Sequence, residues 1–120
     1  APRISVFTML HENADYDQLI ENIEEAIEAN DIWIFHYWKA KTYFFMGKYN
    51  EAVNIVKEHC VNLNPWSIDE YYLMGDAYKA LKNYDRAEEA YKKAYDVNRW
   101  DAQRSYNEKM MSLQEARQQE

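Results

Sequence analysis

Two residues that could do nucleophilic chemistry stand side by side at His59-Cys60. A cysteine attacks as its thiolate, and a histidine within hydrogen-bond reach can take the thiol proton. Adjacent residues on a helix point about 100° apart, so these two side chains do not meet as nucleophile and base. We therefore expect no catalytic pair here and interpret His59 as a core or boundary residue in a position where an alanine would pack.

The other polar residues show no pattern of a catalytic or metal site. His11, His36 and His59 lack the spacing of metal ligands. The pairs Glu24-Glu25 and Glu88-Glu89 stand next to one another along helices, which places them on the surface and not across a cleft. There is no glycine-rich phosphate loop. The sequence predicts no catalytic residue, no metal, no cofactor and no enzymatic activity.

The length and composition of the chain limit its possible fold classes. The chain has 120 residues, of which 48% are hydrophobic, with only two glycines and two prolines. This length suits one domain, and this composition excludes disordered, collagen-like and turn-rich β proteins. The chain is therefore expected to be mostly helical.

The formal net charge of -7 argues against binding to nucleic acid, which needs a stripe of lysine and arginine. The first 31 residues carry eight acids against one base, Arg3, and the rest of the chain is balanced. This acidic end either steers a basic partner or is a solvated helix face. Both interpretations remain open at this stage.

Nothing in the sequence resembles a membrane or export signal. No apolar run approaches the roughly 18 residues that span a bilayer, so no membrane insertion is expected. The start Ala1-Pro2-Arg3 does not resemble a signal peptide, and the single Cys60 forms no internal disulfide. A cytoplasmic location is predicted, with a nuclear one as the alternative.

Apolar residues recur with a period near 3.6 between short breaks, which predicts amphipathic helices joined by tight turns. Asn13 or Asp15 is expected to cap the first long helix, and Gly47 to end the second. Asn64-Pro65 should end the third, and a capping box of Ser67 with Glu70 should start the fourth. The predicted helices cover residues 15–29, 32–46, 49–63, 67–81, 84–97 and 101 towards 120, with a short leading helix over 4–12.

Self-comparison shows a repeat. The segment Ala40 to Ala52, with tyrosines at 43 and 49, recurs 35 residues later as Gly75 to Ala87, with tyrosines at 78 and 84. A weaker copy begins at Asp15. The small residues are expected where paired helices cross closely, and the tyrosines should fill the space beside them.

These residues and this spacing resemble tetratricopeptide repeats, helix-turn-helix units of 34 residues. The resemblance implies an all-α fold, a right-handed superhelical stack of such repeats with a C-terminal capping helix. It also implies one domain over residues 1–120: a degenerate first repeat (1–32), a second repeat (33–67), a third repeat (68–101) and a capping helix (102–120). The second repeat departs from the pattern, because His36 and Lys39 replace large apolar residues and one extra residue precedes Pro65.

In this family the first helix of each pair lines a concave groove that holds a partner peptide or helix. The resemblance therefore implies a protein-protein interaction module, with an aromatic groove whose ligand carries apolar anchors and a basic residue near Asp69 and Asp76. From the capping helix, Gln103, Tyr106 and Met110 are expected in this groove. The residues predicted to bind the partner are Tyr37, Lys41, Phe44, Asp69, Tyr72, Asp76, Lys79 and Tyr106.

Three alternatives stay open. Co-chaperone members of the family bind acidic chaperone tails with a clamp of lysines, asparagines and an arginine, but the matching places here, counted from the second repeat, hold Tyr37, Lys41, Leu73, Gln103 and Asn107. The aromatic helix 32–46 could instead form a homodimer or scaffold surface through Trp38 or Phe45, within a multiprotein complex. The chain could also be an accessory domain of a larger enzyme.

Overall fold

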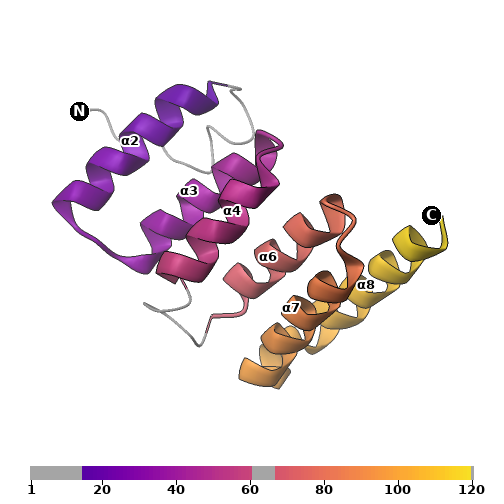
Figure 1. Cartoon of the computed structure of the whole chain (residues 1–120). Coiled ribbons are helices and arrows are strands. Elements are labelled where there is room, and N and C mark those ends of the chain that lie inside the picture. Colours follow the sequence, from indigo (N-terminus) through magenta and orange to yellow (C-terminus); the bar gives the residue numbers. More distant parts are fainter. Residues whose placement is uncertain (1–14, 61–66, 120) are drawn as a thin grey trace.

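The computed structural model describes residues 15–60 and 67–119, and within these ranges all regular structure is helical (Figure 1). The predicted all-α class is confirmed. The short helix expected over residues 4–12 lies outside the described residues. The elements are α2 (Tyr16–Ala29), α3 (Trp33–Phe45), α4 (Tyr49–Ile55), the π-helix η1 (Val56–Cys60), α6 (Asp69–Ala80), α7 (Tyr84–Val97) and α8 (Arg99–Gln118).

Side chains that accept hydrogen bonds from the first turn fix the start of the first and last described helices. Asp15 caps α2, and its Oδ1 accepts a hydrogen bond from the Gln18 amide at 3.2 Å. Asn98 caps α8 in the same way, through the amide of Asp101 at 3.2 Å. The sequence suggests Asp101 as this cap, which is wrong by three residues, because the Asn98 side chain is the one that accepts from the first turn.

The capping box predicted at Ser67 and Glu70 does not form. Helix α6 begins at Asp69, and no side chain caps it by a hydrogen bond. Glu70 is fully buried, and its carboxyl lies near the Ser67 hydroxyl and the Glu70 backbone amide.

The helices pack as antiparallel pairs that stack along the chain, as Figure 1 shows. Helix α3 packs against α4 and η1, α6 packs against α7, and α2 and α8 cover the two ends by packing on α3 and α7. Contacts between α4 and α6 join one pair to the next. This arrangement confirms the predicted stack of helical repeats.

Small residues lie where the paired helices cross. Ala40 and Ala52 are buried in one cluster with Leu73, and Ala87 is buried in the next. At Gly75 the approach is close, because an added Cβ would meet Cε1 of Tyr91. The close crossing that the sequence predicts at these positions is therefore present, and at Gly75 it leaves no room for a methyl group.

The extra residue of the second repeat is accommodated inside a helix. Ala52 and Val56 are buried, and so are Ala87 and Tyr91, their counterparts 35 residues later in the chain. Cys60 is also buried, but its counterpart, Ala94, comes only 34 residues later. The π-helix η1 covers this step, and a π-helical turn accepts one residue more than an α-helical turn. Cys60, not His59, therefore occupies the alanine-like position.

Aromatic helix α3 is covered more completely than its sequence suggests. Phe35 and Trp38 pack against Leu19 and Ile23 of α2, so Trp38 does not form an open surface. Phe45 remains 45% exposed. Helix α2 thus covers the Trp38 side of α3, which leaves Phe45 as the exposed aromatic residue of the surface considered for self-association.

Candidate functional site

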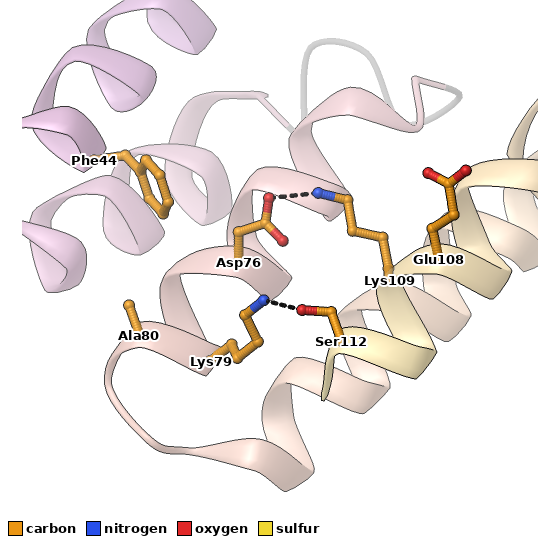
Figure 2. A pocket seen from close by; sticks show the side chains of 7 residues that line it. All are labelled: Phe44, Asp76, Lys79, Ala80, Glu108, Lys109 and Ser112. Carbon is orange, nitrogen blue, oxygen red and sulfur yellow. Dashed lines mark hydrogen bonds and ion pairs between the residues drawn. The ribbon is translucent and has the colours of Figure 1, made fainter. Parts of the chain in front are cut away.

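A hollow of about 400 Å³ lies between α3 and α6, which are the first helices of the two helix pairs, and the last helix, α8 (Figure 2). Phe44 comes from α3 and forms an apolar wall, and Ala80 on α6 is exposed. The remaining lining is polar. The residues that line the hollow are Phe44, Asp76, Lys79, Ala80, Glu108, Lys109 and Ser112.

Asp76 is held on both sides. Its Oδ1 accepts a hydrogen bond of 2.6 Å from the Tyr91 hydroxyl, and its Oδ2 accepts one of 2.6 Å from Nζ of Lys109. The ion pair with Lys109 joins α6 to α8 across the hollow (Figure 2). Because Lys109 already neutralises it, Asp76 is a poor partner for a basic residue of a ligand.

Lys79 has a neutral partner. Its Nζ donates to Oγ of Ser112 at 2.7 Å, and no carboxylate of a described residue pairs with it. Glu108, also in the lining, is exposed. The Lys79 ammonium has further N–H groups that can donate hydrogen bonds, so this part of the hollow suits a carbonyl or carboxylate oxygen of a ligand.

Acidic groups surround Tyr37 on the neighbouring part of α3. Burial raises the pKa of the Tyr37 hydroxyl well above its ordinary value of 10, and Asp69, Glu70 and Asp76 add to the rise. Nζ of Lys41 lies 5.9 Å from the centre of the Tyr37 ring. The structure thus brings Tyr37, Lys41, Phe44, Asp69, Asp76 and Lys79 of the predicted set towards one side of the stack.

The other two predicted residues serve mainly in packing. Tyr72 is only 8% exposed, and its hydroxyl donates to the Ala102 carbonyl oxygen at 2.8 Å. Burial raises the pKa of Tyr72 to about 12. Tyr106 packs its ring on Tyr95, with centroids 4.8 Å apart. Both tyrosines hold α8 against the preceding helices.

Sequence reasoning missed Ala80 and the three α8 residues of the lining, Glu108, Lys109 and Ser112. We expected Gln103, Tyr106 and Met110 from this helix, on the assumption that α8 repeats the register of α6. Helix α8 instead buries Ala102 and Leu113, and this face sets its rotation. The apolar pair at this spacing is the signal that would have placed Lys109 and Ser112 next to α6.

Glu70 lies near Tyr37 in the interior and has no exposed area. Neither of its carboxylate oxygens has a hydrogen-bond partner of normal geometry among the described residues. Burial raises the pKa of Glu70 to about 7, although the nearby Ser67 hydroxyl and the Glu70 backbone amide offset part of the rise. Tyr37 and Cys60 are near enough for this carboxyl to raise their pKa values.

Cys60 is in a poor setting for nucleophilic attack. It is fully buried, and its Sγ points to the Trp33 carbonyl oxygen at 4.0 Å. Burial, with a contribution from Glu70, raises the pKa of the Cys60 thiol to about 12. Its neighbour His59 stacks on His36, with ring centroids 4.2 Å apart, and not on the thiol.

The described part of the chain has neither a metal-binding cluster nor a membrane-spanning helix. No group of three or more histidine, cysteine, aspartate or glutamate side chains in residues 15–60 and 67–119 is placed to hold a metal ion. Among the helices of the same residues, none combines the length and the apolar character that crossing a membrane requires.

Sequence comparison gives two matches. The family model described as anaphase-promoting complex, cyclosome, subunit 3 matches residues 12–94, which is more than half of the chain. Heat shock protein STI1 of Saccharomyces cerevisiae is 33% identical over 86 residues, which cover 70% of this chain. The matched region spans only 14% of the length of the yeast protein.

Several solved structures share the fold. The first tetratricopeptide domain of Spaghetti (RPAP3), bound to the HSP90 peptide SRMEEVD, is 19% identical with a TM-score of 0.72, covering 90% of this chain and 86% of that one. The first such domain of human RPAP3 is 18% identical with a TM-score of 0.74, and the match covers 94% of this chain and 90% of that one. The Sgt2 tetratricopeptide domain of Aspergillus fumigatus is 19% identical with a TM-score of 0.71, and the match covers 92% of this chain and 75% of that one.

Proposed function

The chain belongs to the tetratricopeptide-repeat family described as anaphase-promoting complex, cyclosome, subunit 3, and we propose on this premise that it binds an extended segment of a partner protein in the hollow between α3, α6 and α8. The observation that carries the proposal is the Lys79–Ser112 hydrogen bond beside the apolar wall of Phe44. Members of such families use the first helices of the repeats for this purpose.

The proposed segment makes three kinds of contact. An apolar side chain lies against Phe44 and the exposed Ala80, and a backbone carbonyl or carboxylate accepts from Lys79. A basic residue pairs with Asp69, which is exposed in the first turn of α6, and not with Asp76, whose oxygens are already used. Tyr37 and Lys41 extend the surface along α3. In this proposal Tyr72 and Tyr106 shape the groove from behind.

The experiment compares capture of partners from an extract by the wild type, Lys79→Ala, Ala80→Trp and Lys93→Ala. Lys79→Ala should weaken binding about tenfold by removing a charged hydrogen bond, and Ala80→Trp should fill the hollow without touching the core. Lys93 is exposed on α7, outside the hollow, and serves as the control. A partner that Lys79→Ala and Ala80→Trp capture as well as the wild type and Lys93→Ala do would contradict the proposal.

A second candidate function is binding of an acidic chaperone tail. Three lysines, Lys41, Lys79 and Lys109, lie on or beside the proposed groove, and one similar structure is bound to the peptide SRMEEVD. Two observations argue against this candidate. Lys109 is already paired with Asp76, and most of the places of the chaperone-tail clamp hold other residues than the clamp requires. Titration of fluorescent SRMEEVD peptide decides: saturable binding that Lys79→Ala weakens favours this candidate, and no binding up to millimolar peptide dismisses it.

A third candidate is a scaffold subunit that self-associates within a multiprotein assembly. The family description, which names a subunit of a complex, supports it, as does the exposed Phe45 on α3. Sedimentation of the wild type and Phe45→Ser at high micromolar concentration tests it, because a monomer in both samples rejects self-association. For all three candidates we propose a cytoplasmic or nuclear protein without catalytic activity.

A further inference from the structure

A second hollow, of about 300 Å³, lies on a different side of α3 from the proposed groove. Its walls come from α2, α3, α4 and η1, so it lies where the first described helix meets the following pair. Its lining is part acidic, part imidazole and part apolar. The residues are Glu24, Ile27, Glu28, His36, Lys39, Ile55 and His59.

The imidazole wall of this hollow is a stacked pair. The rings of His36 and His59 are nearly parallel, at 8°, with centroids 4.2 Å apart. His36 is almost fully buried, and its Nε2 lies 2.5 Å from Oδ1 of Asp31. This contact fixes the His36 ring, and His59, which is about half exposed, continues the stack towards solvent. The π-helix places His59 here.

The opposite wall is acidic. Glu24 is paired at 3.8 Å with Lys39, a second lining residue. Glu28 forms no ion pair with a described residue and is exposed at the edge of the hollow. Apart from the histidines, the two carboxylates and one ammonium of the lining sum to one negative charge, and the Asp31 carboxylate lies behind His36. The surrounding surface has the same sign, because α2 carries five acids and no base.

We propose that this hollow receives an arginine side chain of a basic segment of a partner protein. The planar guanidinium lies against the imidazole wall and donates hydrogen bonds to Glu28, while Ile27 and Ile55 contact the aliphatic stem. Charge complementarity favours this occupant, since α2 repels acidic chains and attracts basic ones. A lysine supplies charge without a plane to stack, so arginine is preferred.

The test uses the peptide acetyl-Gly-Arg-Arg-Gly-amide, with lysine and citrulline versions, titrated into the labelled chain while the imidazole signals are followed by NMR. The arginine peptide should shift the ring signals of His36 and His59 and saturate, and the lysine peptide should bind more weakly. Citrulline, which has the same shape without the charge, should not bind.

Matched variants separate the hollow from the general acidity of the helix. Glu28→Gln should weaken binding of the arginine peptide about fivefold, as expected for a partly exposed ion pair. Glu25→Gln removes the same charge from an α2 position that does not line the hollow, and should change binding less than twofold. Equal loss in both variants, unmoved histidine signals, or equal binding of lysine or citrulline would overturn the proposal. None of these outcomes affects the groove between α3, α6 and α8.

Discussion

Replacing Glu70 with glutamine should make the stability of the fold less dependent on pH. The buried carboxyl has a pKa raised from 4.5 to about 7, mainly by burial. Below pH 4.5 it is protonated in both the folded and the unfolded chain. Between the two values the unfolded chain releases the proton and the folded chain keeps it, so the free energy of unfolding falls as the pH rises.

The size of this effect follows from the two pKa values. At about 1.4 kcal/mol per pKa unit, the full difference costs the wild type about 3 kcal/mol above pH 7. Glutamine has nearly the same shape and does not titrate. The stability of Glu70→Gln minus that of the wild type should therefore increase by about 3 kcal/mol between pH 4.5 and pH 8, whatever constant cost the buried amide adds.

Urea denaturation followed by circular dichroism at half-unit steps of pH measures both chains. Every other titrating group is common to the two, so the difference isolates residue 70. A difference that stays flat across this range would show that the carboxyl is solvated or paired in the folded chain. A difference that decreases would show that the folded chain favours the ionised form, and either result refutes the reasoning.

Three further substitutions test the backbone and the helix crossing. Gly75→Ala should destabilise the fold by about 1–3 kcal/mol, because the added methyl meets the Tyr91 ring; in thermal melts the same substitution should cost less when Tyr91→Leu is already present. Lys82 has φ 64° in the turn that corresponds to Gly47, whose φ is 80°. Lys82→Gly should gain up to about 1 kcal/mol, less whatever its side-chain interaction contributes, whereas Gly47→Ala should lose about 1 kcal/mol in the same melts. A stabilised Gly47→Ala would show that this turn does not need the left-handed region.

Local signals predicted much of the fold. The spacing of small residues from Ala40 to Ala87 identified the helix pairs, and the breaks at Gly47 and after Asp15 placed helix ends within a residue or two. These features depend on neighbours in the chain, where sequence is most informative. The Ser67–Glu70 capping box was wrong because α6 begins at Asp69 and packing buries Glu70 completely, and no local pattern reports that burial.

The candidate groove was predicted less completely than the fold. Of the residues predicted to bind the partner, Phe44, Asp76 and Lys79 line the hollow, and their binding role stays a prediction. The partners on α8 were missed because a helix at the end of the stack is rotated by the residues it buries, Ala102 and Leu113, and not by the repeat. Which residues a ligand contacts is a separate question that the binding experiments address.

The π-helical turn Val56–Cys60 also bears on how such a chain changes over generations. A gain of one codon in a helix usually rotates everything after it by about 100° and exposes the core. Here the wider π-helical turn places the additional residue on the outer side of the helix, so Val56 and Cys60 are both buried. The reverse mutation, loss of Glu58 or a neighbour, should be tolerated by the core, and the visible effect would be the separation of His59 from His36.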